Sequence, residues 1–372
     1  MAALVPFMAL YYQELGLPGA QIGLLLSISP LVSLIANPLW SGLADATHRH
    51  KTVLTVTFLT TALVLAAIPS FKILWLLFLA ISIYSFFAAP IMSLVDSATL
   101  TMLGDHKEEY GRLRFWGTIG YGLVAPFVGG FLQRFGLKWS FWIFAGGVFL
   151  TLFPARRLTF NHVQSDNSFR QGMRKLLLNR RWIFFLAMTF IAGIGLSVYN
   201  SYLSVLMQSL GGSKSLTGIA ITVSTLSELP VMFFSSLLLR RMKTRGLFTL
   251  AMALTGIRCL LFGVAGSPAG IIAVQLLHGL TYGALWVSGV TYASENAPAG
   301  LSATAQGLFG SVLMGFGAAA GNLLGGILIE NLNPSGMFDV IGGIVLVGMI
   351  VFLLLEKWLM SVRLRRETPA EP

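Results

Sequence analysis

Residues 182–208 read WIFFLAMTFIAGIGLSVYNSYLSVLMQ, a run of 27 residues that contains no Asp, Glu, Lys or Arg. About 20 apolar residues in a helix cross the roughly 30 Å of hydrocarbon in a bilayer. A helix is needed because, in lipid, each backbone N–H and C=O must find its partner within the segment. The stretch therefore predicts a transmembrane helix.

The rest of the chain repeats this pattern. Its 372 residues are 55% hydrophobic and 10% charged, whereas soluble domains carry about 25% charged residues. A soluble protein is thereby excluded, and we expect an all-α, multi-pass membrane protein. Ten further apolar stretches have the length of a span: 20–43, 52–69, 73–103, 113–132, 138–155, 215–239, 247–265, 270–294, 302–329 and 336–356.

The segment 2–12 is also apolar, but its eleven residues make about half a span, and a turn-like sequence follows at 14–19. We interpret it as the second half of a twelfth helix whose beginning is missing. A signal peptide is the alternative, although no basic region precedes the apolar residues as such a peptide requires.

A polar stretch divides the predicted helices six plus six. The phrases GGFLQ at 129–133 and GGILIE at 325–330 end the fifth helix of each half, and two related six-helix halves are a recurrent transporter plan. We expect them to surround a central cavity. The predicted units are an N-terminal half with an incomplete first helix, a cytoplasmic linker, a C-terminal half and a cytoplasmic tail: 1–155, 156–181, 182–356 and 357–372.

The net charge of +11 comes from 25 Lys and Arg against 14 Asp and Glu. Twenty of the basic residues fall in alternate loops on one side, and four fall in the loops on the other. Because cytoplasmic loops are enriched in Lys and Arg, both termini and the linker are predicted to lie in the cytoplasm, at the plasma membrane. The excess of positive charge is then explained by the orientation of the chain in the membrane and by contact with anionic lipid head groups. It does not require a nucleic-acid partner.

Few ionisable side chains lie within the spans, where each costs about 2.5–3.5 kcal/mol. Glu228 and Arg258 are each about 16 Å deep at 1.5 Å per residue, and His278 is near the same level. We expect these three to form a polar centre on three helices. Asp96 and Arg114 are predicted to form a second acid–arginine pair, although both pairs could also be internal struts without substrate contact.

Two other observations narrow the chemistry. Tyr121, two turns deeper than Arg114, would offer an aromatic face near that charge. The single cysteine, Cys259, favours packing, and no spaced Cys/His/Asp set predicts a metal site. A membrane enzyme is excluded because no nucleophile with a base and no phosphate-cradling loop is evident.

Residues 110–117, YGRLRFWG, preceded by Asp96, resemble the major facilitator superfamily over essentially the whole chain. The branch is the one that contains lactose permease, phenylpropionate permease and nucleoside:proton symporters. The interval from Asp96 to Arg114 is that of the essential acid and arginine of lactose permease, and Tyr121 stands at the place of its sugar-stacking tryptophan.

In the second half, the order Glu228, Arg258, His278 repeats the acid, arginine and histidine of the same permease. The departures are Thr281, where that permease has a proton-releasing glutamate, and three uncharged residues in place of its helix 7 aspartates and helix 11 lysine: Asn200, Leu203 and Met314. Phenylpropionate permease is the closer match, because it shares the phrase 275–278, QLLH, and also lacks that glutamate.

The loop 41–51, SGLADATHRHK, is a degraded form of the superfamily motif between helices 2 and 3. Asp45, Arg49 and Lys51 keep its acid and bases, while His48 occupies a usual glycine position. The resemblance implies that these residues gate the cytoplasmic side.

The resemblance implies a secondary active transporter that moves a small organic solute by alternating access and proton symport, as a monomer and without a cofactor other than the proton. The solute would be an aromatic acid, a sugar or a nucleoside. The implied substrate-binding residues are Asp96, Arg114, Tyr121, Asn200 and His278, and the implied proton-coupling residues are Glu228, Arg258 and His278.

Two other functions are compatible with the sequence. One is export of hydrophobic compounds by proton antiport, because abundant Phe and Met suit a permissive pocket. The other is a transport-dead membrane sensor or scaffold, which the incomplete first helix would favour.

Overall fold

The structure is a computed structural model that describes residues 1–104, 106, 109–159, 178–297 and 301–367. Every regular element in these ranges is helical, and ten of the helices are long and apolar enough to cross a membrane. The expected span 138–155 forms an 18-residue helix that is not among those ten.

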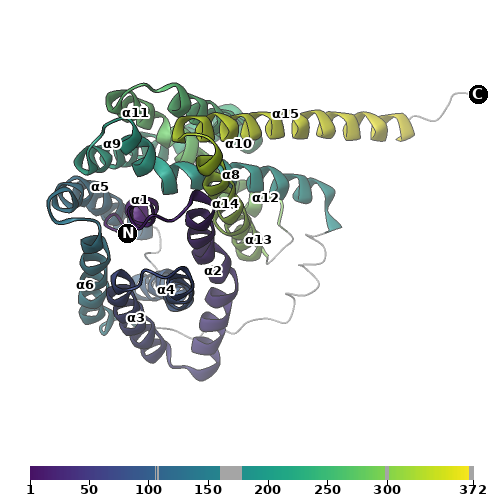
Figure 1. Cartoon of the computed structure of the whole chain (residues 1–372). Coiled ribbons are helices and arrows are strands. Elements are labelled where there is room, and N and C mark those ends of the chain that lie inside the picture. The colour runs from purple at the N-terminus through teal and green to yellow at the C-terminus, as the bar shows by residue number, and fades with distance from the viewer. Residues whose placement is uncertain (105, 107–108, 160–177, 298–300, 368–372) are drawn as a thin grey trace, which may run out of the picture.

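The first half contains a short helix within the apolar segment 2–12, followed by five longer helices (Figure 1). The segment forms a 3-10 turn, Val5–Phe7, followed by α1, and it is buried against α8 of the second half. The elements are α1 (Met8–Glu14), α2 (Gly19–Thr47), α3 (His50–Ala67), α4 (Leu74–Leu103), α5 (Tyr110–Phe135) and α6 (Lys138–Ala155).

The second half contains six membrane-length segments, two of which are divided by turns of other helix types. These elements are α8 (Arg180–Ser209), α9 (Lys214–Phe233), α10 (Ser235–Val264), α11 (Pro268–Val274), α12 (Ala284–Glu295), α13 (Ser302–Gly310), α14 (Ala318–Asn331) and α15 (Pro334–Glu367). In Figure 1, α3, α4 and α6 lie on one side of the molecule and α10, α11 and α15 on the other.

Local sequence explains where these helices begin. The side chain of Asn179 accepts the backbone N–H of Arg181 at the start of α8, and Ser213 does the same for α9. Ser267 caps α11, whose first residue is Pro268. Such caps satisfy backbone N–H groups that have no partner within the helix. Proline at the first position loses no helical hydrogen bond, because an N–H group there would have no acceptor in the helix.

The two halves meet through helix pairs that are far apart in sequence. α2 packs along α14, α5 packs along α9, and α1 packs against α8. Glycines allow the close approach: a Cβ on Gly23 would lie 2.6 Å from the carbonyl oxygen of Asn322, and a Cβ on Gly129 would lie 2.3 Å from that of Lys214.

Two polar contacts at one end of the bundle are repeated with the halves exchanged. The backbone N–H of Lys214, at the start of α9, donates to Gln133 Oε1 at the end of α5 (3.0 Å). The backbone N–H of Ala20, at the start of α2, donates to Glu330 Oε2 at the end of α14 (2.8 Å). The Lys214 side chain also pairs with Glu14 at the end of α1 (3.0 Å). We call this region the Lys214 end.

A second repeated pair lies deeper in the same two interfaces. Thr222 of α9 donates from its hydroxyl to the carbonyl of Gly122 in α5 (2.6 Å), and Ser27 of α2 donates to the carbonyl of Ala319 in α14 (2.9 Å). Each half therefore forms similar hydrogen bonds with the fifth helix of the other half, at Gln133 and Glu330 within the repeated phrases and again at Gly122 and Ala319 just before them.

At the opposite end, which we call the basic end, polar contacts join helices within one half. Thr244 of α10 bonds Glu295 of α12 (3.1 Å), and the Lys51 ammonium at the start of α3 lies 3.5 Å from the carbonyl of Arg156, just after α6. His48 and Lys243 have positive φ, at 56° and 58°, in corresponding turns of the two halves.

Two expected spans differ from the observed helices. The span 215–239 is divided between α9, which ends at Phe233, and the first part of α10, residues 235–242. Lys243 has non-helical φ and ψ, so the chain breaks within the charged sequence 240–245, between the expected spans 215–239 and 247–265. α15 continues to Glu367, beyond the expected end at 356. Residues 160–177 of the predicted linker lie outside the described residues.

Candidate functional site

The segment that carries His278 is not a continuous α-helix. After α11, residues Gln275–Leu277 form a 3-10 turn and Gly279–Gly283 form a π-turn before α12 begins. Single π-turns within α-helices occur frequently at functional sites. His278 lies at the junction of the two turns, facing α9 and α10.

Three of the predicted residues meet there in a hydrogen-bonded chain. His278 Nε2 is 2.6 Å from Glu228 Oε1 of α9, and His278 Nδ1 is 2.8 Å from a terminal nitrogen of Arg258 in α10. We expected a direct pair between Glu228 and Arg258, but the histidine stands between them. The three side chains meet, as the sequence led us to expect, but the sequence did not predict this order.

Arg258 is the most enclosed member of the chain, with 1% of its surface exposed. Its guanidinium also donates to Thr281 Oγ1 (2.9 Å) and to Gln275 Oε1. The ring of Tyr199, from α8, lies 4.1 Å from the guanidinium carbon, a distance at which a cation is attracted to an aromatic face. Arg258 thus ties three helices together.

The donors of Arg258 determine the tautomer of His278. A guanidinium has no acceptor, so His278 Nδ1 accepts and carries no proton. The proton of the neutral ring is then on Nε2, which donates it to the Glu228 carboxylate. A second proton on the ring would sit on Nδ1 and face the guanidinium N–H groups, so this geometry disfavours the imidazolium.

Aromatic rings extend from this cluster along the same segment. The Tyr282 ring stacks on His278 with centroids 5.5 Å apart and an interplanar angle of 12°, and Trp286 stacks on Tyr282 at 6.3 Å and 24°. Both rings are half-buried. They make a stack of planar groups that begins at the polar cluster.

The predicted residues of the first half are placed less completely. Tyr121 of α5 is half-buried and lies within electrostatic range of Glu228 and Tyr282, so the two halves converge at the cluster. Asp96 is half-buried on α4. Arg114 belongs to α5, but its side chain lies outside the described residues, and so does its predicted pair with Asp96. Asn200 is exposed on α8 and takes no part in the hydrogen bonds of the cluster.

The predicted gating loop joins α2 to α3. Asp45 Oδ1 is 2.8 Å from Nε2 of His50, the first residue of α3, so a polar contact bridges the turn. Arg49 precedes α3 and is exposed, as is Lys51. His48 adopts the left-handed backbone conformation, which glycine adopts more readily. The backbone at this position therefore keeps the conformation that the usual glycine would have, and a residue with a Cβ adopts it at some cost in free energy.

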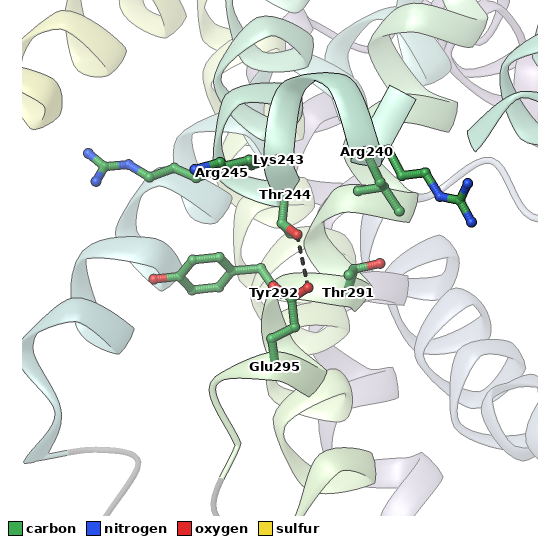
Figure 2. A pocket seen from close by; sticks show the side chains of 8 residues that line it. Arg240, Lys243, Thr244, Arg245, Thr291, Tyr292 and Glu295 are labelled. Carbon is green, nitrogen blue, oxygen red and sulfur yellow. Dashed lines mark hydrogen bonds between the residues drawn. The ribbon is translucent and has the colours of Figure 1, made fainter. Parts of the chain in front are cut away.

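A cavity of about 470 Å³ lies at the basic end, away from the polar cluster. Figure 2 shows the Thr244–Glu295 hydrogen bond at its centre, while the side chains of Arg240 and Arg245 extend outward in opposite directions. These positive charges do not converge on a common point, so this cavity is a poorer candidate binding site than the polar cluster.

Sequence reasoning missed Tyr199 and the roles of Gln275 and Thr281 as acceptors for Arg258. The spacing of 275, 278 and 281 is a signal that could have found two of them, because residues three apart lie on one helical face. Tyr199 offers no such signal. Within the described residues, no group of three His, Cys, Asp or Glu side chains could hold a metal ion.

Known proteins resemble the chain along its length. The model of the MFS_1 like family matches residues 1–340. The maltose permease of Geobacillus stearothermophilus is 29% identical, covering 95% of this chain and 91% of that protein. The probable 3-phenylpropionic acid transporter of Escherichia coli (strain K12) is 22% identical, covering 93% and 92%. The crystal structure of the nucleoside transporter NupG is similar with a TM-score of 0.84 at 18% identity, covering 96% of this chain and 95% of that one.

The all-α fold that the sequence predicted is confirmed by this structural similarity, and the superfamily resemblance is confirmed by the family match. The protein is a multi-pass membrane transporter and not an enzyme. It belongs to the MFS_1 like family of the major facilitator superfamily.

Proposed function

We propose that the protein carries a small organic solute across the plasma membrane by alternating access, coupled to symport of a proton. Its two halves, 1–155 and 182–356, would rock around a site formed by Glu228, His278 and Arg258. The linker 156–181 and the tail 357–372 would lie in the cytoplasm, the basic end would contact anionic lipid head groups, and a monomer would suffice. Neither a cofactor nor a nucleic acid is required.

The observation that carries the proposal is the chain from Glu228 through His278 to Arg258. Because Arg258 holds His278 in its neutral form, Glu228 is the member of the chain that can accept a proton without disturbing the other contacts. Its side chain is 13% exposed, which leaves a route for the proton. A carboxyl group that alternates between its charged and neutral forms is what proton symport needs.

The helix contacts support alternating access. The halves are held together at the Lys214 end by Gln133 and Glu330, each bound to a helix of the other half. Contacts at the basic end, such as that between Thr244 and Glu295, join helices of the same half. With the topology that the basic loops predict, this arrangement would be a state closed toward the outside.

The substrate class follows from the stacked rings. Planar bases, aromatic acids and the apolar faces of sugar rings all pack on aromatic side chains such as Tyr282 and Trp286, and Tyr121 would add a third ring from the other half.

Of the three candidate classes, we favour a sugar, because the maltose permease shares 29% identity over nearly the whole chain. In the first half, Asp96 and Arg114 would bind the solute from the opposite side, with Asn200 at its edge. Asp45, Arg49 and Lys51 would control the cytoplasmic opening as the halves separate.

Uptake by purified protein in liposomes tests this function. Radiolabelled maltose, a nucleoside and phenylpropionate would each be offered with the outside acidic, and again with a proton ionophore that removes the pH gradient. The proposal predicts accumulation of at least one solute that the ionophore abolishes. Accumulation that survives the ionophore would rule out proton coupling. Uptake into inside-out vesicles alone, and not into right-side-out vesicles, would indicate an exporter.

A further inference from the structure

We propose that Ser227 and Gly279 form a clasp that positions His278 against Glu228, and that Ser227 is therefore a positioning residue for proton coupling. This inference rests on the proposed function, because it explains how the site of that function is held. Ser227 immediately precedes Glu228 on α9, and Gly279 immediately follows His278.

The clasp contains a hydrogen bond between the two segments. The backbone N–H of Gly279 donates to Ser227 Oγ (3.0 Å), and the same hydroxyl donates to the carbonyl of Ser224 within α9 (2.7 Å). The hydroxyl is also 3.4 Å from the carbonyl of Gln275. Ser227 thus contacts the His278 segment one residue after the histidine and three residues before it.

The backbones approach so closely that only glycine fits at 279. A Cβ at this position would lie 2.0 Å from the carbonyl oxygen of Ser227 and 3.1 Å from the Cα of Glu228. The obstacle is backbone, which cannot move aside as a flexible side chain can. Gly279 therefore sets the distance between α9 and the segment that carries His278.

The position of the clasp gives it a direct effect on the Glu228–His278 contact. Because Ser227 and Gly279 are each bonded to a member of that pair, a shift of either backbone moves the carboxylate or the imidazole. The 2.6 Å contact between them would not survive a separation of 1 Å, since hydrogen bonds of this kind end near 3.2 Å. The clasp also lies where the helix changes from a 3-10 turn to a π-turn.

The same π-turn offers a matched control. Gly283 is at its other end and also faces α9, but a Cβ there would meet Val231 Cγ1 at 3.7 Å, an ordinary contact. Gly279→Ala and Gly283→Ala thus add the same methyl group to the same turn and differ in whether α9 must move. Ser227→Ala removes the hydroxyl, and Ser227→Thr keeps it.

Two measurements on the full-length protein separate positioning from stability. The first is the rate at which diethylpyrocarbonate modifies His278, read by mass spectrometry of the purified protein. The second is the ratio of accumulation driven by a pH gradient to exchange at equal pH. We expect Gly279→Ala and Ser227→Ala to raise modification several-fold and to lose accumulation while keeping exchange. Ser227→Thr and Gly283→Ala should resemble the wild type in both.

The proposal is overturned if Gly279→Ala, in folded protein, leaves both the modification rate and accumulation at the wild-type level. It is also overturned if Gly283→Ala has the same effect as Gly279→Ala. If modification rises while gradient-driven accumulation persists, the clasp positions His278 as inferred, but the coupling role proposed for Glu228 is wrong.

Discussion

Gly129→Ala should loosen the Lys214 end of the bundle. The new Cβ would lie 2.3 Å from the carbonyl oxygen of Lys214, whereas an ordinary contact begins at 3.4 Å. The α5 and α9 backbones must therefore separate by about 1 Å, the difference between these distances. Gly130→Ala is the matched control, because its Cβ meets nothing within 4 Å and the change in helix propensity is the same.

The separation stretches two hydrogen bonds between the halves. Lys214 N–H to Gln133 would lengthen from 3.0 Å, and the Thr222 hydroxyl to Gly122 from 2.6 Å. Each such hydrogen bond contributes about 0.5–1.5 kcal/mol net, so together the two bonds stabilise the closed arrangement of this end by about 1–3 kcal/mol. A change of that size shifts a conformational equilibrium by about 5- to 150-fold.

The assay is the rate of maleimide labelling of a cysteine at Thr225 in detergent, in a background where the single native cysteine is replaced by Cys259→Ser. Thr225 is 6% exposed, and its side chain contacts Gly122 across the interface. We expect Gly129→Ala to raise the labelling rate about 5- to 150-fold, and Gly130→Ala to leave it unchanged. Equal rates for both variants would refute the reasoning that glycine packing closes this end.

Three further predictions concern the interior. Arg258→Met should lower the melting temperature in detergent. Three buried acceptors, on His278, Thr281 and Gln275, lose their donor, and each unsatisfied acceptor costs about 1–3 kcal/mol. Arg240→Met, at an exposed site, should leave the melting temperature unchanged. Asn322→Ala should also lower the melting temperature, because the Asn322 side chain joins α2 to α8 by hydrogen bonds. Asn331→Ala, on the same helix, should change the melting temperature little. Tyr282→Leu should raise the half-saturation concentration for the solute several-fold, from a lost ring contact of about 0.5–1.5 kcal/mol, and Tyr282→Phe should restore it.

The number and type of the helices were predictable because the length of an apolar run in lipid is dictated by the bilayer. The apolar segment 2–12 contains a short helix, and its contact with α8 could not be inferred from hydropathy. The charged residues 240–245 were also a valid signal, because the helix breaks among them at Lys243. The earlier interruption at Phe234 was not predictable in this way, because it lies within one apolar run.

The members of the polar cluster were predictable from the sequence, but their arrangement was less so. Glu228, Arg258 and His278 stand out because ionisable groups are rare at membrane depth. Their order depends on the turns around His278, which rotate its side chain between the other two. The same turns contain the contact between Ser227 and Gly279. No local sequence pattern distinguishes this serine and this glycine from the others in the chain.

The pairing of Gln133 and Glu330 with the opposite halves also escaped prediction, although the repeated phrases that contain them were evident. A repeat in sequence indicates equivalent positions in two halves. Only the arrangement of the helices places each phrase against the start of a helix in the other half, where unpaired N–H groups attract an oxygen acceptor.

The central claim is that Glu228 carries the coupled proton, and one comparison tests it most directly. Liposomes containing the wild type or Glu228→Gln would be assayed for accumulation in a pH gradient and for exchange of labelled solute at equal pH. We predict that the variant loses accumulation and keeps exchange, because the amide preserves the shape and cannot release a proton. Accumulation at the wild-type level in Glu228→Gln would contradict the account.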